Sequence, residues 1–157
     1  MLSAFSAQRG LTPKRLVQGV LRSCHVLFCN KGLPTKVGLY FHALEPRFHE
    51  AFAEVVAYFR NLNYRFTDAH AFLAQPDERC VFVSFDDNYR SWYESLPLFD
   101  RLDVHGTFYV NTLPMRNVAS EETIDAYYDR IAYPGPRLPL SEGELIALSN
   151  AGHTIGS

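Results

Sequence analysis

Two adjacent acids follow the most apolar strand that the sequence predicts. Residues 80–85 are apolar at nearly every position, as in a strand buried on both faces of a parallel sheet, and Asp86 and Asp87 come next. Ligands of parallel α/β folds bind at the C-terminal ends of the strands. One carboxylate there could hold a metal ion while the other takes a proton from water. The alternative is a solvent-exposed helix N-cap, where Asp is common.

The elements that would position this acidic pair alternate between strand and helix. Short apolar runs predict strands at residues 37–42, 64–66, 80–85, 106–111 and 153–156. Helical periodicity and capping residues predict helices at residues 48–59, 70–74, 89–101, 120–131 and 141–150. Ser120 is the expected cap of the fourth helix, and Ser141 and Glu144 form the expected capping box of the fifth. Such alternation is typical of a parallel α/β sheet or barrel.

The composition is that of a globular protein. The 157 residues suggest about one domain, and 47% hydrophobic with 20% charged residues excludes a disordered or collagen-like chain. The 12 Phe and 9 Tyr supply core area, or platforms for flat ligands such as sugars. A net charge of −2 gives no reason to expect nucleic acid as a partner.

Charge divides the chain into two parts. Residues 1–44 contain six basic residues and no acid, which marks residues 1–36 as a basic N-terminal extension. Thr12 and Pro13 begin a predicted amphipathic helix that ends near residue 30. We favour packing of its apolar face on the same chain, and membrane contact by residues 12–30 is the alternative.

Nothing in the sequence predicts export or membrane insertion. The three cysteines are an odd number, so no disulfide framework follows from them. No apolar run approaches the roughly 20 residues of a membrane span, and Arg9, Lys14 and Arg15 interrupt any signal-peptide core. We therefore expect a cytoplasmic location.

From residue 37 onward the chain resembles the polysaccharide deacetylase family, also called the NodB-homology domain, of the carbohydrate esterase type. The family's Thr-Phe-Asp-Asp-Gly motif is similar to Ser84–Asn88, and its Ala-Thr-Phe-Phe-Val strand to Gly106–Val110. Its opening strand and its later Leu-Ser and Gly-His-x-Ile-Gly segments match residues 40–42, 140–145 and 152–156. The resemblance covers residues 37–157.

This resemblance implies a metal-dependent hydrolase that removes acetyl groups from a carbohydrate. Asp86 would be the general base, and Asp87 a ligand of a divalent metal, zinc before cobalt or another ion. His42, Asn88 and Tyr89 are candidates for the pocket. The implied fold is an α/β fold, an incomplete (β/α) barrel preceded by the N-terminal helix.

The sequence departs from the family pattern at two places. Asn88 replaces the family's glycine, and Asn is the least costly other residue if that position has a positive φ. The family's two metal-binding histidines would follow Ser157, so the resemblance covers an N-terminal portion only. We therefore expect this chain to be inactive by itself and to self-associate through open sheet edges. The alternative function is a non-catalytic remnant that binds carbohydrate or a partner.

Overall fold

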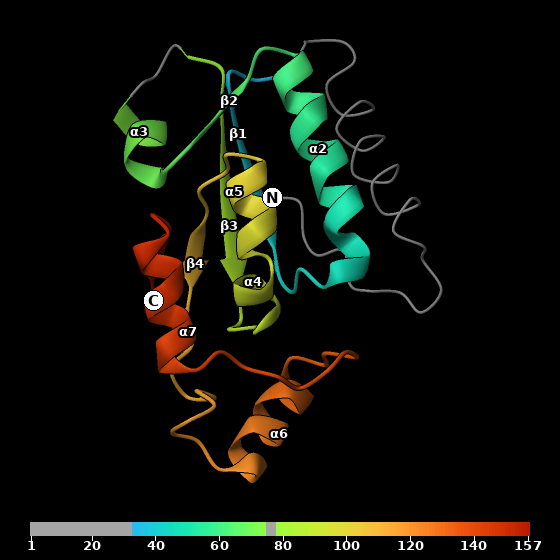
Figure 1. Ribbon diagram of the computed structural model, residues 1–157, viewed down its shortest axis with the longest axis vertical. Coiled ribbons are helices and arrows are strands. Elements are labelled where there is room, and N and C mark those ends of the chain that lie inside the picture. The colour runs from blue at the N-terminus through green and yellow to red at the C-terminus, as the bar shows by residue number, and fades with distance from the viewer. Residues whose placement is uncertain (1–32, 75–77) are drawn as a thin grey trace.

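The structure is a computed structural model that describes residues 33–74 and 78–157 (Figure 1). The helix expected over residues 12–30, with its proposed membrane contact, lies outside the described residues. Within the described ranges, no helix is long and apolar enough to cross a bilayer.

A five-stranded parallel sheet organises the described residues. Its strands are β1 (Lys36–Phe41), β2 (Arg65–Thr67), β3 (Cys80–Asp86), β4 (Thr107–Tyr109) and β5 (Thr154–Gly156), in the order β1-β3-β4-β5 with β2 also paired to β3. β1 pairs along β3 from Cys80 to Phe85, so β2 and β4 follow one another along the opposite edge of β3. The expectation of a parallel α/β fold is confirmed, and closure into a barrel stays a prediction.

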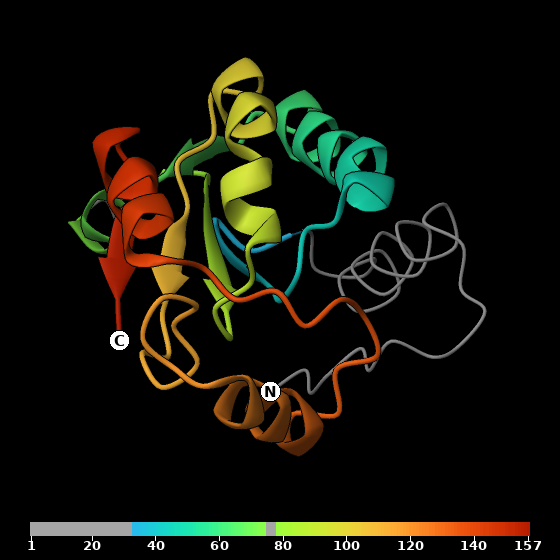
Figure 2. The same cartoon turned by 60° about the horizontal axis from the view of Figure 1, so that its bottom comes forward.

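Helices lie on both faces of this sheet and beyond the C-terminal ends of its strands. They are the 3-10 helix η1 (Pro46–Phe48) and the α-helices α2 (His49–Asn61), α3 (Ala69–Ala74), α4 (Ser91–Glu94), α5 (Leu96–Arg101), α6 (Glu121–Arg130) and α7 (Glu142–Asn150). α2, α4, α5 and α7 lie on the same side of the sheet, whereas α6 lies beyond the strand ends (Figures 1 and 2). α3 is on the face opposite the main core, with Phe72 packed on Phe82. The position of α6 matters for the site described below.

The single helix expected over residues 89–101 is wrong, because it divides into α4 and α5 at Ser95. Pro97 lies in the first turn of α5, where its missing N–H is tolerated, and its ring excludes a continuous helix through this point. The buried hydroxyl of Ser95 donates to the carbonyl oxygen of Ser91 at 2.7 Å, which stabilises the break.

Phe85 is the centre of an aromatic core between the sheet and its helices. Its ring stacks on Phe108 at a centroid distance of 4.8 Å and lies 5.4 Å from Phe99 and 5.6 Å from Phe41. Trp92, at 6.2 Å, is fully buried in the same cluster. Because side chains alternate along a strand, residues 84 and 86 of β3 face the opposite side of the sheet from Phe85.

Candidate functional site

The strand ends bring the predicted acidic pair and His42 to one edge of the sheet. Phe41 is paired with Phe85 at the end of β1, and Asp86 is paired with Tyr109 at the end of β4. The parallel direction of these strands therefore places His42, Asp86 and Asp87 at the same C-terminal edge. This is the edge where parallel sheets bind ligands.

His42 and Asp87 are in direct contact at this edge. Nδ1 of His42 lies 2.7 Å from Oδ2 of Asp87, and the two side chains are 49% and 29% exposed. The main chain of His42 is held as well, because Nε1 of buried Trp92 donates to its carbonyl oxygen at 2.8 Å. The histidine is thus fixed by a core tryptophan and still faces solvent.

The contact favours the charged form of both partners. The hydrogen bond to Asp87 raises the pKa of His42, with help from the charges of Asp87 and Asp86 and against the effect of burial. The same hydrogen bond lowers the pKa of Asp87, and the hydroxyl of Tyr127 lowers it further. The contact therefore favours an ion pair of imidazolium and carboxylate beside Asp86.

Asp86 differs from its neighbour in its proton affinity. Partial burial is the main cause that raises the pKa of Asp86, and the charge of Asp87 adds to it, while His42 acts in the opposite sense. Two adjacent acids whose pKa values move apart are a common sign of an acid–base pair. Asp86 is therefore the better proton acceptor of the two, and its role as general base stays a prediction.

The turn that carries these acids has a left-handed backbone. Asp87 and Asn88 have φ values of 81° and 64°, which L-residues other than glycine adopt at a cost. The φ of Asn88 is thus positive, the condition under which asparagine is the least costly residue other than glycine. Sequence pattern did not predict the same conformation at Asp87.

Two tyrosines of α6 hold this turn in place. The hydroxyl of Tyr127 lies 3.3 Å from both the carbonyl oxygen and Oδ1 of Asp87, and that of Tyr128 lies 3.4 Å from the carbonyl oxygen of Asn88. Both tyrosines are buried. Sequence reasoning missed them, because they lie 40 residues from the acids and only the position of α6 beyond the strand ends brings them there.

The other two pocket candidates are buried beside the acids. Asn88 is fully buried and its Nδ2 donates to Sδ of Met115 at 3.6 Å. Tyr89 is 3% exposed, and its ring packs 4.6 Å from that of Tyr133 and 5.8 Å from that of Tyr128. Both residues pack beneath the turn, whereas His42, Asp86 and Asp87 are at least partly exposed there.

The described residues do not by themselves form a complete metal site. Asp87 and His42 supply two donors, and no group of three His, Cys, Asp or Glu side chains in the described ranges could hold a metal ion. A catalytic zinc ion usually has three protein ligands. His153 cannot contribute, because it precedes β5 at the opposite edge of the sheet, where its Nδ1 accepts from the N–H of Gly106 at 3.2 Å.

Comparison with solved structures shows a likeness of fold. No protein-family model and no curated protein matches the sequence. The solved structure of a de-N-acetylase from Aggregatibacter actinomycetemcomitans is similar, with a TM-score of 0.54 and 14% identity over 76% of this chain and 53% of that one. This chain thus spans about half the length of that enzyme, and the likeness shows a deacetylase-like fold.

Proposed function

We propose that the chain belongs to a hydrolase that removes acetyl groups from an N-acetylated carbohydrate. The observation that carries the proposal is the contact of His42 with Asp87 at 2.7 Å beside Asp86, at the ligand-binding edge of a fold similar to that of a de-N-acetylase. Asp86 is the proposed general base. Asp87 holds His42, and His42 is the proposed electrostatic partner of the reacting amide.

The geometry supports hydrolysis of an amide by water. Asp86, with its raised pKa, takes a proton from a water molecule as the water oxygen bonds to the carbonyl carbon of the acetamide. Positive charge on His42 stabilises the negative charge that develops on the carbonyl oxygen. The proton then passes from Asp86 to the nitrogen as the C–N bond breaks, which leaves acetate and a free amine.

A divalent metal, zinc in the first instance, stays part of the proposal with Asp87 as one ligand. The described donors do not complete such a site, so no step above depends on it. The same shortage supports the expectation that the 157-residue chain is inactive alone. It also favours the alternative function, a carbohydrate-binding domain without turnover.

Acetate release from N-acetylated chito-oligosaccharides tests the proposal. The assay uses the 157-residue chain, and the same chain together with any coding sequence that follows codon 157, each with zinc, cobalt or a chelator. We expect metal-dependent release by the longer protein and little by the shorter one. Binding of the oligosaccharide by both proteins without release by either would favour the binding domain, and metal-dependent release by the shorter chain would show that its own residues complete the site.

A further inference from the structure

The carboxylate of Glu144, in the first turn of α7, binds two arginines. Its side chain is only 10% exposed, and Oε1 lies 2.9 Å from Nε of Arg90 and 2.7 Å from Nη2 of Arg116. Oε2 accepts a hydrogen bond from the N–H of Ser141 at 2.9 Å. Burial acts to raise the pKa of Glu144, but the hydrogen bonds from Ser141 and Arg90 outweigh it and hold that pKa below its ordinary value. These contacts therefore favour the charged carboxylate.

Arg90 connects Glu144 to the acidic turn. It follows Asp87 by three residues and comes directly before α4. α4 carries Trp92, whose indole N–H donates to the carbonyl oxygen of His42 at 2.8 Å. A shift of Arg90 would therefore move the main chain beside the acids and also the tryptophan that holds His42.

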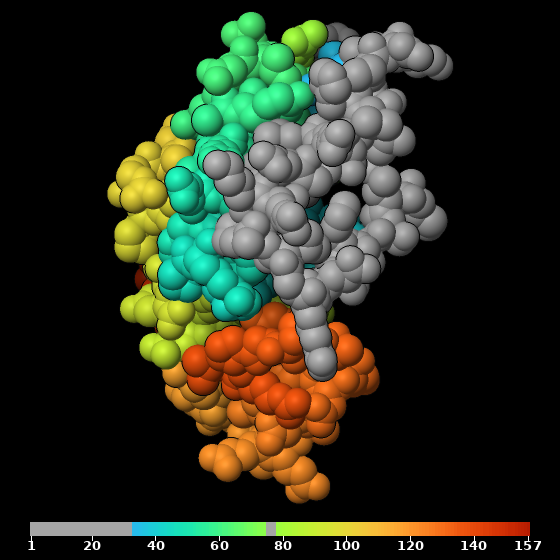
Figure 3. Space-filling model, turned by 90° about the vertical axis from the view of Figure 1, so that its right-hand side faces the viewer, coloured from blue at the N-terminus to red at the C-terminus, as the bar shows by residue number. Residues whose placement is uncertain are grey.

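Arg116 and Ser141 connect Glu144 to the segment that carries α6. This α6 segment, residues 111–140, leaves the sheet after β4, forms one end of the molecule, and returns to α7 (Figure 3). Near its start, the N–H of Arg116 donates to the carbonyl oxygen of Leu140, at its end, with a distance of 3.0 Å. Glu144 binds Arg116 and Ser141 at this same place. It thus fastens the two ends of the α6 segment together.

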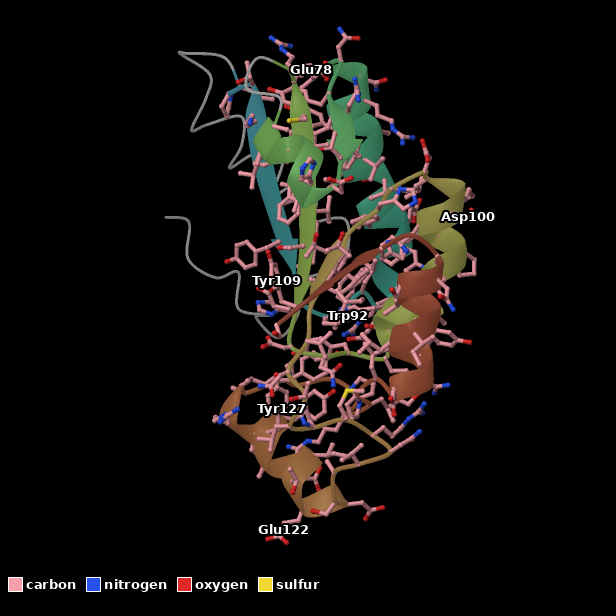
Figure 4. The ribbon with its side chains drawn as sticks, turned by 90° about the vertical axis from the view of Figure 1, so that its left-hand side faces the viewer. Glu78, Trp92, Asp100, Tyr109, Glu122 and Tyr127 are labelled. Carbon is pink, nitrogen blue, oxygen red and sulfur yellow. The ribbon has the colours of Figure 1, made fainter. Side chains whose placement is uncertain are left out.

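The α6 segment in turn contacts the acidic turn through two tyrosines. Figure 4 shows Tyr127 between α6 and the strand ends. The hydroxyls of Tyr127 and Tyr128 lie 3.3 and 3.4 Å from oxygen atoms of Asp87 and Asn88, which is longer than the usual distance of about 2.7–2.8 Å. Hydrogen bonds between charged groups are stronger than such contacts. The ion pairs of Glu144 are therefore the firmer attachment of this segment.

We propose that Glu144 is a positioning residue for the acidic turn. Its charge holds Arg90 on one side of the turn and closes the α6 segment on the other, so that Tyr127 and Tyr128 stay in contact with the turn. This role is separate from the capping of α7, which needs a hydrogen-bond acceptor at residue 144 but no charge.

Glu144→Gln separates the charge of this residue from its capping role. Glutamine can still accept from the N–H of Ser141, because a capping box takes Glu or Gln, but it gives the arginines no opposite charge. Ser141→Ala is the reverse change, since it removes the hydroxyl that caps α7 and keeps the carboxylate. A positioning charge predicts the larger effect on the acidic turn in Glu144→Gln, and a helix cap alone predicts it in Ser141→Ala.

Hydrogen exchange in the 157-residue chain, followed by NMR, measures how firmly the turn is held. The reporters are the indole N–H of Trp92, the only tryptophan, and the amides of Arg90 and Arg116, which bond to the residues before α7. In Glu144→Gln we expect these groups to exchange about tenfold faster relative to the amides of β3, since hydrogen bonds between charged groups contribute on this scale. In Ser141→Ala we expect unchanged relative rates.

Two further variants keep the test decisive if Glu144→Gln folds poorly. Arg116→Gln removes one ion pair from a side chain that is 34% exposed, and should speed exchange of the remaining reporters. Glu78→Gln breaks the pair of Glu78 with Arg65, at 2.9 Å and away from the turn, and should leave the reporters unchanged. Equal changes in Ser141→Ala or Glu78→Gln would overturn the proposal, as would reporters that keep their rates in both Glu144→Gln and Arg116→Gln.

The consequence for catalysis rests on the proposed function and is measured separately. In the longer protein of the acetate assay, Glu144→Gln should lower kcat about tenfold or more and change KM little, because displacement of the base slows the reaction more than it weakens binding. An unchanged kcat in an active protein would remove Glu144 from catalysis. Faster exchange at the reporters, in a protein that releases no acetate in any form, would support the positioning of the turn while the proposed hydrolase fails.

Discussion

The two edges of the sheet each hold a histidine, in opposite environments. At the C-terminal edge, His42 is half-exposed and bonded to a carboxylate, which raises its pKa. At the N-terminal edge, His153 is 7% exposed between Phe99 and Phe108, each at a centroid distance of 5.2 Å, and burial lowers its pKa to about 4. The surroundings of the histidine thus favour its charged form at one edge and its neutral form at the other.

This contrast shows which edge of the sheet carries the solvent-facing titratable groups. The C-terminal edge retains solvent-facing charge and a left-handed turn at Asp87 and Asn88, features that cost stability. At the N-terminal edge, the imidazole of His153 is buried and its Nδ1 accepts a hydrogen bond from the N–H of Gly106. We therefore expect substitutions at the first edge to change activity, and acidification to act on stability through the second.

The largest effect should follow from Asp86→Asn. In the longer protein of the acetate assay, loss of the proton acceptor should reduce acetate release at least 100-fold, the usual contribution of general base catalysis, with little change in the unfolding midpoint. Asp103→Asn is the matched control, because Asp103 is an exposed acid near the N-terminal edge with a φ of 45° that Asn also tolerates. Equal turnover by the Asp86→Asn protein would remove Asp86 from the mechanism.

The next largest effect should be a loss of stability on acidification, caused by His153 at the N-terminal edge of the sheet. An unfolded histidine titrates near 6.5 and buried His153 near 4, so the unfolded state binds the extra proton and stability falls as the pH is lowered from about 6.5 to 4. The full difference between the unfolded and folded pKa values of His153 corresponds to roughly 3 kcal/mol of unfolding free energy. His42 has the opposite sign, since its raised pKa gives stability below 6.5 that is lost as the pH rises through its folded value.

Urea unfolding at a series of pH values measures how much His153 and His42 each contribute to the pH dependence of stability. Replacement of His153 by Gln should flatten the acid limb of the stability curve, and replacement of His42 by Gln should leave that limb in place. An acid limb that is unchanged in the His153→Gln protein would show that other groups cause it.

The smallest effect concerns the backbone of the acidic turn. Asn88→Ala should unfold more readily than Asn88→Gly by about 1 kcal/mol, since alanine has the steric cost of a left-handed φ that glycine avoids. Both variants remove Oδ1 of Asn88, a buried acceptor that has no partner in the described part of the chain, so this loss does not affect their order. Thermal unfolding of the two variants checks the order, and the reverse order would mean that the Cβ of residue 88 contributes more by packing than it costs in strain.

Local pattern in the sequence determined much of this protein. The acidic pair after an apolar strand, the capping box of Ser141 and Glu144, and the Ser120 cap of α6 are all present in the structure as predicted. Each of these features depends on residues within a few positions of one another, where periodicity and capping chemistry act. The break at Ser95 was missed, although Pro97 is a local signal for it.

Only the tertiary structure decided which side chains meet at the site. His42 and Asp87 are 45 residues apart, and Tyr127 reaches Asp87 across 40 residues. These contacts exist because parallel pairing aligns the ends of β1 and β3 and because α6 lies beyond them, and no periodicity in the chain encodes either arrangement. The sequence by itself therefore determined the acids and the strand that presents them, while the fold determined the partners that give those acids different proton affinities.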